Sequence, residues 1–353
     1  MAATPDPLEK THDGSSARAT SKQTIPIAGI LCDLYGLEEL SASAKEVTCL
    51  WLLNPRLSNK ARMQPMADAA IRGWEKRPGS SSRGLICVAF DQRNHGTRLV
   101  DKRANEAWRS GNPNHAQDMF SVFQGTAADT SQLINYLPAY AFPDSERFIT
   151  DHIVLGVSLG GHAAWHCVLH DPRITAAVVV IGCTDYVRVM SDRARLSKLH
   201  TWTSTDPPGK TFLGSRDFPP SLLEAVDRWD PTGLLMGPMF ERNVNVNQVL
   251  RDPSERELQQ LLPLMRTHLA GKRILNMAGG ADKLVPYKAS ESFLKWLKKA
   301  IAPGGWYSGR GVHLEDRIFD GVGHEFTPGM MQEAIRFISE TLEGHRTGAD
   351  AKI

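Results

Sequence analysis

The chain has 353 residues, of which 41% are hydrophobic and 23% charged, as is usual for a globular protein with a large core. Its 41 basic and 39 acidic residues give a formal net charge of +2, which offers no electrostatic basis for binding nucleic acid or an anionic membrane surface, and no apolar run is long enough to span a bilayer. We therefore expect a small molecule as its partner.

The first half of the chain indicates strands that alternate with helices. Residues 1–22 are rich in Pro, Ser, Thr and Asp and lack the apolar core of a signal peptide, so a disordered tail is predicted there. Apolar, β-rich stretches then predict strands at Ile25–Leu34, Val47–Leu53, Leu85–Phe90, Ile153–Leu155 and Ala176–Ile181. Helical spacing is found at Met66–Trp74 and Ala127–Leu137. Such alternation predicts an α/β fold: a mainly parallel central sheet with helices on both faces.

The region 186–269 interrupts this alternation with Pro207-Pro208-Gly209, Pro219-Pro220 and scattered aromatic residues, and we interpret it as a lid insertion. Its aromatic side chains either line an acyl pocket or fill a small core of their own. Regular order resumes with segments at Arg273–Met277, Ala289–Ala300, Leu314–Phe319 and Pro328–Leu342. The predicted core thus comprises residues 23–185 and 270–343, followed by a flexible tail at 344–353.

The pentapeptide Gly156-Val157-Ser158-Leu159-Gly160 lies between a predicted strand and a helix-like stretch, which is the layout of a nucleophile elbow. The serine of such an elbow sits on a strained turn, and side chains two residues before and after it would collide with neighbouring backbone. The pattern therefore predicts Ser158 as a nucleophile whose Oγ is held clear of the sheet.

A serine hydroxyl is a weak nucleophile at neutral pH and needs a histidine to accept its proton and an acid to orient that histidine. His324 follows one predicted strand, between flanking glycines, and is the predicted base. Asp282 follows the preceding predicted strand, at the edge where open sheets place ligands, and is the predicted acid. Asp185, which follows the strand after the elbow helix, stays open as an alternative acid.

The segments GVSLGG, GGADKLVP and GVGHEF together resemble the α/β-hydrolase superfamily over roughly residues 25–342. The resemblance implies the α/β-hydrolase fold, the chain order Ser, Asp, His, and an oxyanion hole that includes the N–H of Leu159. The second donor would come from the loop after the third strand, which reads Leu53-Asn54-Pro55-Arg56 here. Because proline has no N–H, Arg56 is the expected donor. The turn 91–96 resembles a scaffold of the site in this superfamily.

Three histidines, His162, His166 and His170, recur at helical spacing and could share one face for a metal ion. No carboxylate or cysteine pattern completes such a site, so we interpret them as helix-packing or surface residues and predict no metal.

These residues favour a cofactor-independent serine hydrolase that cleaves an ester or thioester through an acyl-enzyme. The stretches LLNPRLSNKARMQP and AFDQRNHGTR resemble fungal α/β-hydrolases of secondary-metabolite pathways, including polyketide toxin biosynthesis. Two alternatives stay open: an acyltransferase that uses the same three residues, and a non-catalytic ligand-binding protein of the same fold.

Two features bear on location. The five cysteines are odd in number and scattered, mostly in apolar runs, which favours buried thiols in a reducing compartment. The final residues Ala351-Lys352-Ile353 resemble the address that peroxisomal import receptors read at a free C-terminus. We therefore expect a peroxisomal protein with an import receptor as a partner, the alternative being a cytoplasmic one.

Overall fold

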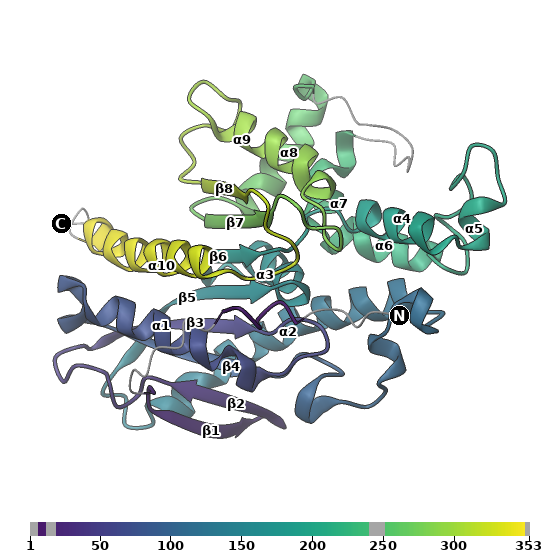
Figure 1. Cartoon of the computed structure of the whole chain (residues 1–353). Coiled ribbons are helices and arrows are strands. Elements are labelled where there is room, and N and C mark those ends of the chain that lie inside the picture. The colour runs from purple at the N-terminus through teal and green to yellow at the C-terminus, as the bar shows by residue number, and fades with distance from the viewer. Residues whose placement is uncertain (1–5, 12–18, 240–250, 350–353) are drawn as a thin grey trace.

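A computed structural model describes residues 6–11, 19–239 and 251–349. Its centre is one eight-stranded sheet in the order β1-β2-β4-β3-β5-β6-β7-β8 (Figure 1). The strands are β1 (Lys22–Ile27), β2 (Ile30–Tyr35), β3 (Glu46–Leu53), β4 (Arg83–Phe90), β5 (Phe148–Val157), β6 (Ile174–Val180), β7 (Arg273–Gly279) and β8 (His313–Phe319). From β4 through β3 to β8 every neighbouring pair is parallel, so the mainly parallel sheet predicted from the sequence is confirmed.

The first predicted strand, Ile25–Leu34, is in fact two antiparallel strands, β1 and β2, that form a hairpin. Its two-residue loop is Ala28-Gly29, and both residues have positive φ, 50° and 79°. Two consecutive positive φ angles give the turn whose twist matches paired strands. Because apolar residues lie on both sides of the loop, the sequence pattern does not show that the strand is interrupted there.

Helices cover both faces of the sheet. The α-helices are α1 (Gln64–Glu75), α2 (His115–Ala141), α3 (Leu159–His170), α4 (Tyr186–Ser197), α5 (His200–Thr203), α6 (Pro220–Trp229), α7 (Pro231–Met236), α8 (Glu255–His268), α9 (Lys288–Ile301) and α10 (Pro328–Ala349). Short 3-10 helices are η1 (Lys60–Met63), η2 (Pro78–Ser81), η3 (Gly96–Arg98), η4 (Arg103–Asn105), η5 (Trp108–Ser110) and η6 (Gly237–Met239). Helices α1 and α10 bury one core with one face of the sheet, and α2, α3 and α9 bury a second core with the other. Successive apolar side chains of central strands such as β5 point to opposite faces of the sheet, so each strand contributes to both cores.

The region between β6 and β7 contains α4 to α8; in Figure 1, α4, α5 and α6 lie to the right of the strands and α8 lies above β7. Of the aromatic residues predicted there to line a pocket or fill a core, Trp202, Phe212 and Phe218 are buried in the core that α2 and α3 share. Trp202 and Phe218 each pack against Phe212. This aromatic group therefore attaches the region 186–269 to the core that packs against α2 and α3.

Both predicted tails are partly ordered. Within the N-terminal stretch, the Leu8 side chain is only 3% exposed, and the Pro7 carbonyl accepts a hydrogen bond from the Phe326 N–H at 2.8 Å. One buried apolar side chain thus fixes residues 6–11 despite their polar surroundings in the sequence. At the other end, α10 continues to Ala349, because a single glycine at 344 costs a helix only about 1 kcal/mol.

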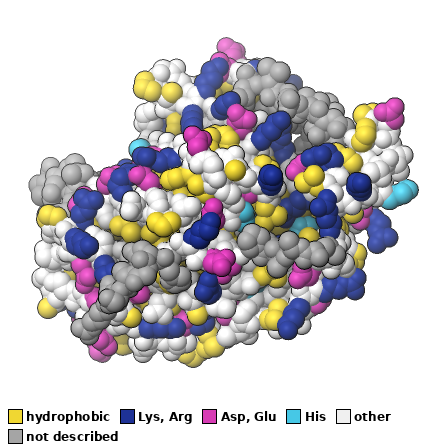
Figure 2. Space-filling view, in the orientation of Figure 1, with side chains coloured by type: hydrophobic (Ala, Val, Ile, Leu, Met, Phe, Trp, Pro, Cys, Tyr) yellow, Lys and Arg dark blue, Asp and Glu magenta, His cyan; other side chains and the backbone are white. Residues whose placement is uncertain are grey.

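Lys and Arg side chains are interspersed with Asp and Glu over the face shown in Figure 2. All five cysteines are buried with free thiols. Within the described ranges, no helix combines the length and apolar character needed to cross a bilayer.

Candidate active site

The serine of the elbow occupies a single-residue turn between β5, which ends at Val157, and α3, which begins at Leu159. Ser158 has φ 55° and ψ −111°, a conformation that costs a non-glycine residue about 1–3 kcal/mol. Its N–H donates to the Val180 carbonyl on β6 at 2.9 Å, which helps to hold the turn. The strained backbone therefore presents the Oγ above the edge of the sheet.

The two glycines that flank this serine are required by close backbone approaches. A Cβ at Gly156 would lie 1.9 Å from the Gly160 carbonyl oxygen. A Cβ at Gly160 would lie 2.1 Å from the carbonyl oxygen of Leu53, the last residue of β3. Both distances are far below van der Waals contact, which is the physical reason for glycine at these two positions.

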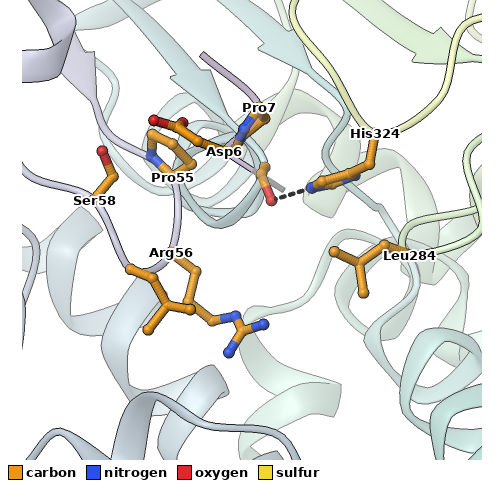
Figure 3. Close-up of a pocket in the computed structure, with 9 residues that line it drawn as sticks. Asp6, Pro7, Pro55, Arg56, Ser58, Leu284 and His324 are labelled. Atoms are coloured by element: carbon orange, nitrogen blue, oxygen red, sulfur yellow. Dashed lines mark hydrogen bonds between the residues drawn. The ribbon is translucent and has the colours of Figure 1, made fainter. Parts of the chain in front are cut away.

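The structure brings together the three side chains expected to act as nucleophile, base and acid. The Oγ of Ser158 lies 2.8 Å from Nε2 of His324, the contact drawn as a dashed line in Figure 3. Nδ1 of His324 lies 2.7 Å from Oδ2 of Asp282. The other carboxylate oxygen, Oδ1, accepts the N–H groups of Leu284 and Val285 at 2.8 and 2.9 Å. With its carboxylate fixed in this way, Asp282 can hold the proton on Nδ1, so that Nε2 is free to accept the serine proton.

Asp185, the alternative acid, has a different place. Its Oδ1 accepts the backbone N–H of Arg188 at 3.0 Å and caps the start of α4. The structure does not bring it to His324, whose Nδ1 faces Asp282.

The two expected oxyanion donors lie next to the serine. Leu159 begins α3, and the first N–H groups of a helix have no partner within the helix and carry its positive dipole end. Arg56 lies in the loop after β3 and lines the same pocket as Ser158. The turn 91–96, which is expected to scaffold the site, forms hydrogen bonds with the segment that follows β3. Gln92 Nε2 donates to the Asn54 carbonyl, and Asp91 Oδ1 accepts the Lys60 N–H at 2.8 Å.

The pocket in front of Ser158 is lined by residues from five segments of the chain: Asp6, Pro7, Pro55, Arg56, Leu57, Ser58, Ser158, Leu284 and His324 (Figure 3). The contribution of the N-terminal segment, Asp6 and Pro7, is not predicted by the sequence. Nothing in the composition of residues 6–11 distinguishes them from an unstructured tail, apart from the single apolar Leu8. The buried hydroxyl of Ser58 lacks a hydrogen-bond partner among the described residues.

The three histidines at helical spacing are packing residues. His162 stacks on Phe123, and His166 meets the edge of the same ring. His170 packs against Trp229. Burial lowers the pKa of His162 to about 3 and that of His170 to about 4. In the part of the chain that the structure describes, no three His, Cys, Asp or Glu side chains are grouped to hold a metal ion.

Comparison with protein families agrees with the fold. The sequence model described as "Alpha/beta hydrolase family" matches residues 65–338. The chain belongs to this family. A comparison with curated proteins gives no match.

Solved structures with the same α/β-hydrolase fold include TT1662 from Thermus thermophilus, at 16% identity and a TM-score of 0.51, with 92% of this chain and 99% of that chain covered. An S-formylglutathione hydrolase from Agrobacterium tumefaciens matches at 14% identity and a TM-score of 0.46, covering 91% and 94%. An acylaminoacyl peptidase from Pyrococcus horikoshii matches at 12% identity and a TM-score of 0.47, covering 93% of this chain and 42% of the peptidase. At such identities the likeness concerns the fold alone.

Proposed function

We propose that this α/β-hydrolase is a serine hydrolase that cleaves an ester or thioester through an acyl-enzyme on Ser158. The observation that carries the proposal is the continuous hydrogen-bond chain from Asp282 through His324 to the serine Oγ. Such a chain lets the histidine take the serine proton as the Oγ attacks a carbonyl carbon, while the carboxylate stabilises the imidazolium that forms.

In the first half-reaction the C–O or C–S bond of the substrate breaks, and His324 returns the proton to the leaving alcohol or thiol. The carbonyl oxygen, negatively charged in the tetrahedral intermediate, would accept hydrogen bonds from the N–H groups of Leu159 and Arg56. In the second half-reaction His324 takes a proton from water, whose oxygen attacks the carbonyl carbon of the acyl-enzyme. The bond between that carbon and the Ser158 Oγ then breaks, His324 returns the proton to the Oγ, and the acid is released. The resemblance to fungal secondary-metabolite hydrolases supports an acyl intermediate of such a pathway as the substrate.

A fluorophosphonate probe tests the nucleophile directly, because it phosphonylates activated serines. We expect the wild-type protein to gain one adduct, located at Ser158 by peptide mass spectrometry, and the Ser158→Ala variant to gain none. An adduct of equal yield in Ser158→Ala would show that another residue is the nucleophile.

Turnover of 4-nitrophenyl esters and acyl-CoA thioesters of increasing chain length then separates esterase from thioesterase activity. Hydrolysis gives the free acid, and the acid must remain the main product when an alcohol is added. A product that shifts to the ester of the added alcohol would indicate an acyltransferase instead.

A further inference from the structure

The N-terminal segment, residues 6–11, is held against the loop that carries His324. The Phe326 N–H donates to the Pro7 carbonyl at 2.8 Å, and Thr11 Oγ1 donates to the Phe326 carbonyl at 3.2 Å. The segment therefore binds both backbone groups of one residue in this loop.

The same segment contacts η1, the 3-10 helix that follows β3. Its Asp6 carboxylate lies 2.7 Å from the guanidinium of Arg62 in η1. Asp6 and Pro7 both line the pocket, and Figure 3 shows them between Pro55 and His324, two other residues of the pocket lining. The segment thus bridges the pocket and forms one of its walls.

The cavity that this wall encloses is small. Its volume is about 100 Å³, whereas pockets for drug-sized ligands usually have about 300–1,000 Å³. A chain of more than a few atoms that points toward Asp6 and Pro7 has no room there unless the segment moves.

One apolar side chain holds the wall in place. Leu8 is 3% exposed and packs in the core that α1 and α10 form with the sheet. The ion pair between Lys10 and Glu325 contributes little by comparison, because the lysine side chain is 70% exposed. A terminal segment held in this way can detach without unfolding the core, so truncation of Leu8 should remove the wall.

We propose that the N-terminal segment determines substrate size: Asp6 and Pro7 restrict the pocket at Ser158 to esters or thioesters with short acyl chains. The proposal rests on the function proposed above for Ser158 and names its substrate class. The cause is steric. A long chain that the wall keeps out of the pocket loses the burial of its methylene groups, each of which contributes about fourfold in affinity.

Steady-state kinetics with 4-nitrophenyl butyrate and 4-nitrophenyl octanoate test this size limit. We expect the wild type to prefer the butyrate ester. Leu8→Ala should raise the octanoate-to-butyrate ratio of kcat/KM by about tenfold or more, because four additional methylene groups gain a place to be buried. Leu8→Asp, which puts a carboxylate into the apolar core, should raise the ratio at least as much. A displaced His324 loop would slow both esters alike and leave the ratio unchanged.

Leu342→Ala is the matched control, because Leu342 is buried in the same core but lies on α10, outside the pocket lining. It should keep the wild-type ratio, as should Lys10→Ala. Hydrogen–deuterium exchange of residues 6–11 shows whether a Leu8 variant has released the segment. An unchanged ratio in a variant with a released segment would overturn the proposal. Equal kcat/KM for both esters in the wild type, or an equal rise of the ratio in Leu342→Ala, would overturn it too.

Binding without turnover separates this inference from the proposed hydrolysis. 2-Nonanone has the carbonyl and the chain of an octanoate ester but no leaving group, and it can be titrated into the Ser158→Ala protein by calorimetry. We expect Leu8→Ala in that background to tighten its binding by about tenfold or more. If no ester is cleaved but the ketone binds more tightly after Leu8→Ala, the hydrolase function fails and the size limit stands. If esters are cleaved but neither the kcat/KM ratio nor ketone binding responds to release of the segment, the size limit is wrong.

Discussion

The acid of the proposed triad can be identified by exchanging each candidate for the isosteric amide. Asp282→Asn would keep the oxygen that accepts the Leu284 and Val285 N–H groups but would no longer stabilise the imidazolium of His324. We expect kcat for a 4-nitrophenyl ester to fall by roughly 10³–10⁴-fold with little change in Tm.

The matched control is Asp185→Asn. Asparagine caps helices about as well as aspartate, so α4 should keep its start and kcat should stay near the wild-type value. A larger loss of kcat in Asp185→Asn than in Asp282→Asn would reverse the assignment.

At the elbow, Gly160→Ala should be strongly destabilising, because the new Cβ would lie 2.1 Å from the Leu53 carbonyl oxygen on β3. We expect a loss of at least about 2 kcal/mol in the free energy of unfolding, measured with urea. Gly329→Ala, in α10, is the comparison: its Cβ would come no closer than 3.8 Å to another atom, so stability should stay level or rise slightly. An unchanged urea midpoint for Gly160→Ala would contradict the packing described here.

At this scale the sequence predicts Ser158, Asp282 and His324 because each lies in a short pattern after a recognisable strand. The structure places the three in contact. The part of the pocket wall formed by Asp6 and Pro7 could not be found in this way. These residues reach the site through a contact with Phe326 that is distant in sequence and that no local pattern determines.

At the scale of elements, we ask whether the N-terminal segment keeps the loop that carries His324 in position. This segment comprises residues 6–11. This segment contacts that loop through the 2.8 Å hydrogen bond from the Phe326 N–H to the Pro7 carbonyl, and the buried Leu8 anchors it. Leu8→Ala should release the segment and lower kcat severalfold, since His324 lies two residues before Phe326. Thermal unfolding should change little, because a terminal segment can detach without unfolding the core.

Lys10→Ala provides the control for this segment. Lys10 forms a 2.7 Å ion pair with Glu325, but its side chain is 70% exposed, and such pairs contribute little. We expect wild-type kcat for this variant. Equal activity of Leu8→Ala and wild type would show that the segment does not hold the loop in its active position.

The elements that the sequence predicts well are those buried on both faces, since a continuous apolar run next to an amphipathic helix has few other interpretations. β3, β4 and β6 belong to this class. The β1–β2 hairpin and the N-terminal segment do not. Their conformation depends on two positive φ angles at 28–29 and on one buried leucine, features too small to register in a composition-based analysis.

For the molecule as a whole, the C-terminal residues 351–353 lie outside the described ranges, and peroxisomal import is a proposal from sequence. A fluorescent protein fused to the N-terminus of the full chain should gather in peroxisomes of a fungal cell. The same fusion without Ala351-Lys352-Ile353 should stay in the cytoplasm. Peroxisomal signal from both fusions would mean that the tripeptide is not the address.

Acid sensitivity is a second property of the whole molecule, because burial lowers the pKa of six of the described histidines: His95, His115, His152, His162, His166 and His170. In the unfolded chain each imidazole gains a proton near pH 6.5, whereas in the folded protein His152 and His170 stay neutral to about pH 4 and His162 to about pH 3. Their contribution to stability is therefore complete above pH 6.5 and decreases as the pH falls below it. Each such group lowers the free energy of unfolding by about 1.4 kcal/mol per pH unit in this window.

Urea unfolding between pH 7.5 and 5.0 measures this slope. We expect stability to be level above pH 7 and to drop steeply below pH 6.5. His166→Leu removes one of the buried imidazoles, which packs between Phe120 and Phe123, so its slope should be shallower by about 1.4 kcal/mol per pH unit. The absolute stability of the variant at pH 7.5 does not enter the comparison, because only the slope reports protons taken up on unfolding. A free energy of unfolding that stays constant to pH 5.0 would mean that these histidines are not held neutral by burial.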